Sequence, residues 1–418
     1  MTAAAESRAT NAPSRHAIAL LSGHWVSVLG SRLFFVAVAW FLTVQIGVVA
    51  SSWALAVFQF LPTVVMMPIT LALVDLVGRR RIVIASDIAR AAICFVGAGI
   101  AIVGHVAAGL LFAVVVVRLF DTLYAPSIRA GVTEAAGRFG RFSPQYVLLL
   151  ITSSASLLAP LLVPAATTLP VAIVLVVNGA TYLVSLIGCT YGGHLMDANG
   201  PNGVTILQAL RRWRQTIRDG WKEFTRVAVL RRVVPTLPLI DMAYAALVVV
   251  LPAIALGAVD AQDSGWYYAL MVLAYGLSRI VGAEIGRRYI HRKHDGVLLA
   301  INCALQGALY LVAAAAGTTW ILLIAIAVIG VLSGSATLSV NEIVSDAVPS
   351  DARGRVFALI GFAVVAVIPF GPAISGFASG TSPTLTLAIV GSLLLLAGLL
   401  PLTSRQVWTF RSPRAQAA

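Results

Sequence analysis

The sequence predicts an all-α polytopic membrane protein with twelve transmembrane helices in two six-helix bundles. Hydrophobic residues make up 59% of the 418 residues and charged residues only 11%, roughly half the charged fraction of a soluble domain. The mean hydropathy of +0.94 excludes a water-facing surface around a single core. Apolar runs of about 20 residues, the length of a membrane-crossing helix, recur along the chain with short connections between them. Soluble, disordered and disulfide-stapled classes are therefore excluded.

The positive charge follows the same pattern and predicts the topology. The 29 Lys and Arg residues lie almost wholly at alternate junctions between apolar runs, for example at Arg79 to Arg81, Arg211 to Arg232 and Arg405 to Arg414. Basic residues are retained on the cytoplasmic side of a membrane. We therefore expect an even number of spans and both termini in the cytoplasm. Topology explains the net charge of +13, so nucleic acid is not expected as a partner.

The N-terminal bundle is predicted over residues 17–192. A polar tail, 1–16, precedes a first apolar run that is too long for a cleavable signal peptide. Two kinds of junction alternate after the following runs. One kind contains Gly or Pro and no Lys or Arg, and the other is basic. The expected helices are 17–46, 52–75, 82–104, 108–128, 143–165 and 168–192.

The C-terminal bundle is predicted over residues 233–403, followed by a tail, 404–418. The expected helices are 233–257, 265–289, 296–316, 319–344, 355–379 and 383–403. Between the bundles, the polar stretch 193–232 contains a segment whose apolar residues, such as Trp213 and Phe224, recur at helical spacing between arginines. Such an amphipathic helix either lies flat at the lipid headgroups or packs on the cytoplasmic ends of the bundle.

Several other functions lack their sequence signals. Cys94, Cys189 and Cys303 each lie inside an apolar run and are expected to be core residues. No metal-ligand cluster, nucleophile motif or phosphate-binding loop is present in the sequence, and its only lysines are Lys222 and Lys293. We therefore expect neither a metal nor a cofactor, and neither an enzyme nor an ATP-driven pump.

The two halves resemble each other, and the chain resembles a known transporter family. Asp75 to Arg81 after the second helix is matched by Glu284 to Arg288 after the eighth, as in duplicated secondary transporters. In the helix 2–3 loop, Asp75, Gly78, Arg79 and Arg80 fit the pattern Gly-x-x-x-Asp-Arg-x-Gly-Arg-Arg, although Leu71 and Leu76 depart from it. This pattern is similar to that of the major facilitator superfamily. Arg118 stands where the superfamily has an intramembrane arginine. The stretches Tyr124 to Ala130 and Val348 to Val356 more narrowly resemble its enterobactin-exporter-like and multidrug efflux branch.

The resemblance implies a gate at the cytoplasmic ends of the helices. A carboxylate at the end of helix 2 can accept hydrogen bonds from exposed amides that begin a neighbouring helix, and the arginines can bridge to an acid or to headgroups. These contacts would form in one transport state and break in the other; alternatively, the arginines only anchor the topology. The expected gating residues are Asp75, Gly78, Arg79, Arg80, Glu134, Arg353 and Arg355.

Charged residues inside spans are costly and mark functional positions. Asp87 with Arg90, and Arg118 with Asp121, are each three residues apart and so share a helix face. We expect Asp87 and Arg90 to form a structural pair whose side chains extend toward the cytoplasmic headgroups. Arg118 lies near the bilayer centre, where it serves either substrate and proton handling or a buried ion pair.

Arg32 and Asp241 lie in equivalent helices of the two halves, so both could face a central cavity. The resembled branch has an acid in helix 1 next to the position of Arg32. Its absence here leaves Asp241 and Asp121 as the expected proton-coupling residues; alternatively, Arg32 is only a structural partner of Asp241. The expected cavity residues are Arg32, Arg118, Ser31, Tyr124 and Tyr244. His24 is expected to be a hydrogen-bonded interior histidine, with a proton relay as the alternative. The pairs Gly282–Gly286 and Gly330–Gly334 suit close helix contact.

These observations together favour a secondary transporter in a bacterial cytoplasmic membrane. The expected activity is export of a small amphipathic drug-like molecule or a siderophore, by proton antiport with alternating access. An importer or uncoupled facilitator of a small organic anion is the alternative, and a non-transporting membrane protein a further one. The expected partners are the substrate, protons and the lipid bilayer, and one twelve-helix chain is expected to function as a monomer.

Overall fold

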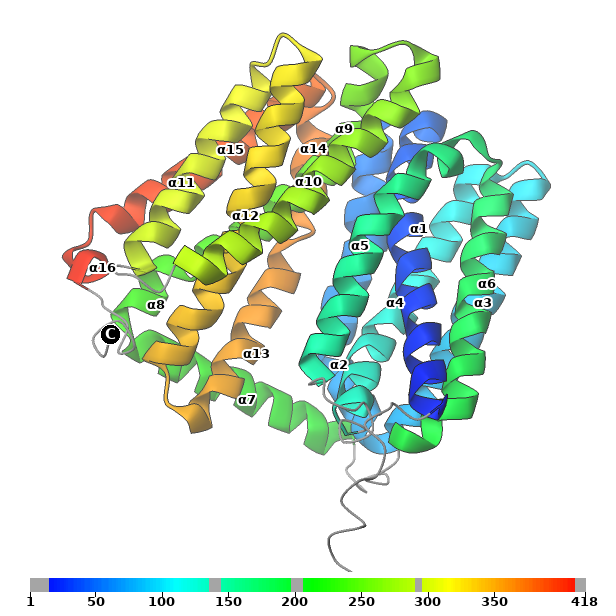
Figure 1. The fold of residues 1–418 in the computed structure, drawn as a ribbon, viewed down its shortest axis with the longest axis horizontal. Coiled ribbons are helices and arrows are strands. Elements are labelled where there is room, and N and C mark those ends of the chain that lie inside the picture. Colours follow the sequence, from blue (N-terminus) through cyan, green and yellow to red (C-terminus); the bar gives the residue numbers. More distant parts are fainter. Residues whose placement is uncertain (1–14, 135–143, 197–205, 290–294, 410–418) are drawn as a thin grey trace, which may run out of the picture. The chain divides into compact units, whose positions relative to one another are not determined.

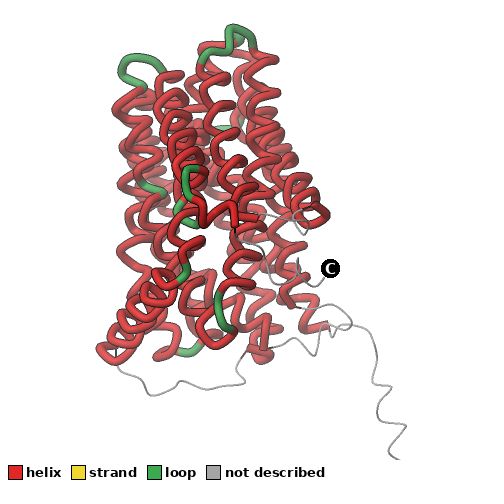
Figure 2. The backbone as a smooth tube through the Cα atoms, turned by 90° about the vertical axis from the view of Figure 1, so that its left-hand side faces the viewer, coloured by secondary structure: helices red, strands yellow, loops and turns green. Residues whose placement is uncertain are grey.

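The structure is a computed structural model that describes residues 15–134, 144–196, 206–289 and 295–409. Helices joined by short turns make up the described residues (Figures 1 and 2). The N-terminal half contains α1 (Arg15–Ala54), the π-helical segment η2 (Leu55–Phe60), α2 (Leu61–Val77), α3 (Arg79–Ile102), α4 (Val106–Glu134), α5 (Pro144–Thr168), α6 (Val171–Gly192) and the 3-10 helix η4 (Gly193–Met196).

The C-terminal half begins with the amphipathic segment and continues with the second set of long helices. It contains α7 (Ile206–Arg226), α8 (Ala228–Val233), α9 (Thr236–Ala258), α10 (Ala261–Tyr289), α11 (Asp295–Ala314), α12 (Thr319–Ala347), α13 (Ser350–Val367), α14 (Phe370–Ala378), α15 (Pro383–Leu402) and α16 (Arg405–Thr409). The predicted eleventh helix, 355–379, is in fact divided into α13 and α14. Pro369 lies at the division, where its missing N–H interrupts the helical hydrogen bonds.

The predicted first and second spans are separated by a backbone break inside α1. Gly47 has a φ of 78° and a ψ of 165°, which are not helical values. A side chain would be strained at this positive φ, whereas glycine adopts it freely. The first span therefore ends one residue beyond its predicted end, and the second continues through η2 to Val77.

The predicted all-helical membrane fold is confirmed. Within the described residues, ten stretches are long and apolar enough to cross a membrane. One of them, Arg15–Met67, contains the break at Gly47 and so comprises two predicted spans. A further helix, α5, has 25 residues and corresponds to the fifth predicted span. Each of the twelve predicted spans thus coincides with helical structure in the described ranges.

The chain divides into two compact units. Unit 1 comprises residues 1–38 and 65–210, and unit 2 comprises 39–64 and 211–418. In unit 1, α3 packs against both α4 and α6; in unit 2, α10 packs against α12 and α11 against α15. Residues 39–64 group with unit 2, where the Trp53 ring meets Phe377 edge-on at 4.6 Å between centroids. The domain limits of the sequence analysis, at 192 and 233, stay predictions.

Close helix contact at the predicted glycines is confirmed for α10 and α12. A Cβ atom on Gly282 of α10 would lie 1.9 Å from the carbonyl oxygen of Val331 on α12, and one on Gly334 would lie 1.9 Å from that of Arg279. Only glycine permits the two backbones to approach this closely. This contact holds α10, and with it Arg279, in a defined position against α12.

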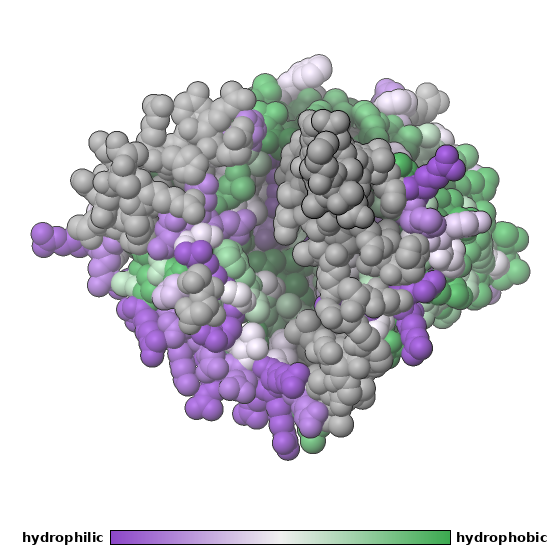
Figure 3. All heavy atoms as spheres, turned by 60° about the horizontal axis from the view of Figure 1, so that its bottom comes forward, coloured by the Kyte–Doolittle hydropathy of each residue, from purple (hydrophilic) through white to green (hydrophobic). Residues whose placement is uncertain are grey.

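The amphipathic helix α7 packs on α13, one of its two predicted placements. The rings of Trp213 and Phe362 meet edge-on at 5.5 Å. A Cβ atom on Gly220 would lie 2.4 Å from the carbonyl oxygen of Arg355. The arginines between these positions are exposed, and Figure 3 shows hydrophilic residues gathered on the face that carries α7.

Candidate functional site

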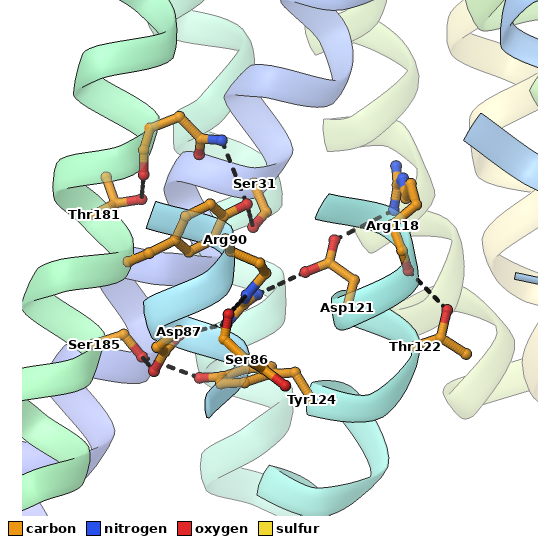
Figure 4. Close-up of polar contacts among 12 residues, drawn as sticks. Ser31, Ser86, Asp87, Arg90, Arg118, Asp121, Thr122, Tyr124, Thr181 and Ser185 are labelled. Atoms are coloured by element: carbon orange, nitrogen blue, oxygen red, sulfur yellow. Dashed lines mark hydrogen bonds and ion pairs between the residues drawn. The ribbon is translucent and has the colours of Figure 1, made fainter. Parts of the chain in front are cut away.

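The charged residues inside unit 1 meet at the guanidinium of Arg90 (Figure 4). Arg90 Nη1 donates to Asp121 Oδ1 at 2.6 Å, and Nη2 pairs with Asp87 Oδ1. The side chain of Arg90 is 1% exposed, that of Asp87 0% and that of Asp121 21%. One cation inside the helices is thus compensated by two carboxylates from α3 and α4, as a buried charge requires.

Two tyrosine rings complete the surroundings of Arg90. Its Cζ atom lies 3.9 Å from the ring centroid of Tyr124 on α4 and 4.3 Å from that of Tyr182 on α6. A planar guanidinium interacts favourably with aromatic faces. The rings also exclude water from the pair with Asp87, so that the charges interact in a medium of low dielectric constant.

These contacts correct the expected placement of Asp87 and Arg90. The two residues do form a pair, but their side chains do not extend toward the headgroups, because both are buried inside unit 1. The expected pair of Arg118 and Asp121 is present, with 3.8 Å between Arg118 Nη1 and Asp121 Oδ2. Arg90, 31 positions from Asp121 in sequence, is a second and nearer partner.

Hydrogen bonds extend this network to α1 and α6. Ser185 donates to Asp87 Oδ2 at 2.8 Å, and the hydroxyl groups of Tyr124 and Ser185 are 3.2 Å apart. His24 Nδ1 lies 3.0 Å from the Tyr124 hydroxyl, which confirms the expectation of a hydrogen-bonded interior histidine. Tyr124, which was expected to line the cavity, is 4% exposed and bonded within unit 1. Direct contact of Tyr124 with substrate is therefore disfavoured.

The remaining expected residues of unit 1 are more accessible. Arg118 is half-buried, and its guanidinium lies 5.2 Å from the ring centroid of Phe35 on α1. Ser31 is half-buried and lies 3.1 Å from the Tyr182 hydroxyl (Figure 4). Arg32, next to it on α1, is exposed. These three residues stay candidates for substrate contact.

A second ion pair lies in unit 2. Arg279 Nη2 on α10 is 3.7 Å from Asp241 Oδ1 on α9, with the two side chains 33% and 21% exposed. Arg279 also reaches Thr337 on α12 at 3.5 Å. The rings of Tyr244 and Tyr275 stack beside the pair at 4.5 Å. Arg279 lies inside the predicted span 265–289, but nothing in the sequence spacing indicated it as the partner of Asp241.

The sequence also matches the model of a known protein family. The model described as Major Facilitator Superfamily matches residues 20–372 and, in a second match, 233–417. The chain belongs to the major facilitator superfamily. It is therefore a multi-pass membrane transporter of small molecules and not an enzyme. No curated protein sequence matches this superfamily member.

Several solved structures that share this fold are named as peptide transporters. A crystal structure of the peptide transporter POT aligns over 95% of this chain and 97% of its own, with a TM-score of 0.70 and 12% identity. A POT family transporter in complex with a thioalcohol-conjugated peptide aligns over 96% of this chain and 99% of its own, with a TM-score of 0.68 and 11% identity. POT in complex with sulfate aligns over 97% of this chain and 99% of its own, with a TM-score of 0.68 and 14% identity. At these identities the likeness shows the fold alone, and the narrower resemblance to exporters stays a prediction.

The described residues include part of the superfamily motif at the junction of α2 and α3. Gly78 has a φ of 88° and precedes the first residue of α3, so the motif's glycine makes the turn between two helices. Arg79 and Arg80 begin α3 and are half-buried. The side chains of Asp75 and Glu134 lie outside the described residues. Where α13 begins after α12, Arg353 donates to the carbonyl oxygen of Val348 at 2.9 Å.

Proposed function

We propose that this transporter exports a small organic molecule in exchange for protons by alternating access. The observation that carries the proposal is a partly exposed ion pair inside the spans of each unit, Arg118–Asp121 and Arg279–Asp241. Charges at such positions are expensive and typically belong to substrate or proton pathways. Both aspartates are 21% exposed, so their carboxylates stay accessible to protons and to a substrate.

Asp241 and Asp121 are the proposed proton-coupling residues. A carboxylate can exchange a proton at physiological pH when its surroundings permit, whereas a guanidinium stays charged. Each aspartate has an arginine beside it that compensates its charge. Protonation of the aspartate would release that arginine and change the charge presented to the substrate.

The proposed substrate contacts are Arg32, Arg118, Ser31 and Tyr244. Arg32 is exposed, and the other three are half-buried. An amphipathic molecule with an anionic group, either a drug-like compound or a siderophore, would match cations beside aromatic rings. Asp75, Gly78, Arg79, Arg80, Glu134, Arg353 and Arg355 are the proposed gating residues. We place the chain as a monomer in a bacterial cytoplasmic membrane, with both termini in the cytoplasm.

Import or facilitated passage of a small organic anion is the second candidate. Besides the buried Arg90, the spans contain Arg32, Arg118 and Arg279, which are at least partly exposed. These cations favour an anionic substrate. Structural neighbours are named as peptide transporters, and POT in complex with sulfate is among them. The direction of transport follows from the coupling and the gradients, so the two candidates share the same residues and differ in their response to an imposed gradient.

Uptake into inside-out vesicles with an imposed proton gradient tests the proposal. The probes are a panel of amphipathic drugs and siderophores, with Asp241→Asn and Arg32→Ala beside the wild type. Asp260→Asn, an exposed residue between α9 and α10, is the matched control. We expect gradient-dependent uptake that Asp241→Asn abolishes and Asp260→Asn preserves. Uptake that ignores the gradient would favour the facilitator, and full gradient-driven uptake by Asp241→Asn would refute coupling at this residue.

A further inference from the structure

We propose that unit 1 contains a proton relay from His24 through Tyr124 and Ser185 to Asp87, and that Asp87 accepts the coupled proton. This inference rests on the proposed proton coupling and adds an acceptor and a path to it. The four residues come from α1, α4, α6 and α3, so the relay crosses four helices. Consecutive polar atoms are 3.0, 3.2 and 2.8 Å apart.

The relay residues are all enclosed within unit 1. Each of the four side chains is at least nine-tenths buried. Water is therefore not needed to connect them, and the direct contacts form a continuous path. Burial of several polar side chains costs free energy unless they are hydrogen-bonded. The four relay residues meet this need by bonding to one another.

The number of available protons determines the direction of every hydrogen bond in the relay. A serine hydroxyl carries one proton, and Ser185 donates it to Asp87 Oδ2. Tyr124 must therefore be the donor in its contact with Ser185. Tyr124 also has only one proton to give, so His24 Nδ1 must be protonated and must donate to the Tyr124 oxygen. All three bonds then point toward the carboxylate.

This common direction permits transfer of a proton along the relay. When both nitrogens of His24 are protonated, the Nδ1 proton passes to the Tyr124 oxygen. The original Tyr124 proton passes to Ser185, and the Ser185 proton passes to Asp87 Oδ2. Each hydroxyl loses one proton and gains one, so the net change is one proton moved from His24 to the Asp87 carboxyl.

Neutralisation of Asp87 changes the pairing of Arg90. Arg90 stays charged and then has Asp121 as its one ionised partner in the network. Asp121 is drawn more strongly to Arg90, which weakens its contact with Arg118 at 3.8 Å. The half-buried Arg118 becomes available to an anionic group. Proton uptake at a fully buried carboxylate is thus linked to the charge on an accessible arginine.

Other groups that face Asp87 respond to the same proton. They come from each helix packed around it: Arg90 on its own helix, Asp121 and Tyr124 on α4, Tyr182, Ser185 and Cys189 on α6, and His24 on α1. Arg90 carries the positive charge beside Asp87, and Asp121 shares that guanidinium with it. A change in the charge of Asp87 therefore acts on both of these side chains.

Infrared spectroscopy of the purified full-length protein in lipid vesicles tests the proposal without a known substrate. The measured quantity is the carbonyl band of protonated carboxylic acids after a drop in pH, followed in amplitude and in time. We expect a band with one component that Asp87→Asn removes and Asp241→Asn retains. Tyr124→Phe and Ser185→Ala keep the final amplitude but slow its appearance on the order of a hundredfold, a typical contribution of one positioned proton-transfer group.

Tyr182→Phe is the matched control. Tyr182 is buried and lies against Arg90 as Tyr124 does, but its hydroxyl bonds to Ser31 and Asn178 outside the relay. We expect this variant to protonate Asp87 at the wild-type rate. Slowing by Tyr182→Phe equal to that by Tyr124→Phe would show a structural effect and overturn the relay.

The remaining outcomes separate this inference from the proposed function. A carboxyl band that is the same in Asp87→Asn as in the wild type overturns Asp87 as acceptor. Unchanged kinetics in both Tyr124→Phe and Ser185→Ala overturn the relay, and these mild variants decide that question even if Asp87→Asn does not fold. If the band behaves as expected but vesicle uptake ignores the gradient, the proposed coupled transport fails while proton uptake by Asp87 stands.

Discussion

Arg90 on α3 and Asp121 on α4 are joined by a 2.6 Å contact between Nη1 and Oδ1 inside unit 1. The same guanidinium pairs with Asp87 one turn earlier on α3. This arrangement connects a fully buried acid with one that is partly exposed. A change of charge on either acid is therefore transmitted to the other through one side chain.

Replacement of Arg90 tests how strongly these charges depend on each other. Arg90→Gln leaves Asp87 buried without a cation, and we expect a loss of about 3–5 kcal/mol in stability. The measurement is unfolding of the full-length protein in detergent. Asp87→Asn combined with Arg90→Gln should cost clearly less than the sum of the two single changes. Strict additivity would show that the two side chains do not compensate each other.

Exchange of the charges in unit 2 distinguishes proton coupling from a structural pair. Asp241→Arg and Arg279→Asp each place like charges within reach of one another, and we expect each to lower the yield of folded protein. The double exchange restores an ion pair and should recover the yield. Gradient-driven uptake in vesicles should not recover, because the carboxylate is then on α10 instead of α9. Recovered uptake in the double variant would assign the pair a structural role.

The contact between α10 and α12 predicts a steric effect at Gly282. Gly282→Ala puts a Cβ atom 1.9 Å from the Val331 carbonyl oxygen, so the helices must separate. We expect a cost of about 1–3 kcal/mol, as for other overpacked sites. Gly257→Ala on α9 is the control, because no atom lies within 4 Å of its added Cβ. Equal melting temperatures for the two variants would contradict the close contact.

The break at Gly47 predicts a backbone effect without a steric one. A Cβ atom there meets no atom within 4 Å, but the φ of 78° is unfavourable for any residue with a side chain. We expect Gly47→Ala to destabilise the protein by about 1–2 kcal/mol. Gly99→Ala, in an open position on α3, should instead be stabilising by about 0.5–1 kcal/mol. A stabilising effect of Gly47→Ala would mean that the break is not required.

Much of the fold could be predicted because the signals for membrane spans are local. Each predicted span coincides with a described helix. The predicted break between the first two spans fell within one residue of Gly47. Pro369 marked a division that the sequence analysis overlooked, because the apolar run continues on both sides of it. Hydropathy reports the length of an apolar run and not whether the helix within it is continuous.

The candidate site was less predictable. Asp87, Arg90, Arg118 and Asp121 were identified because a charge in an apolar run is conspicuous. Their partners were assigned by spacing along one helix, which correctly found Asp87–Arg90 but overlooked Arg90–Asp121. Ser185 and Tyr182 were not identified, since small hydroxyl residues and tyrosines are common in spans and carry no distinctive pattern.

The sequence by itself determined the spans and the superfamily motif of this protein. These features depend on apolar length and on short runs of residues, so each can be recognised within a few tens of positions. Only the tertiary structure decided that Arg90 joins Asp87 to Asp121, that Asp241 pairs with Arg279, and that His24 reaches Asp87 through two hydroxyl groups. The physical reason is that these contacts depend on how each helix is rotated and how closely it approaches its neighbours. Side chains 31 to 100 positions apart set that packing together.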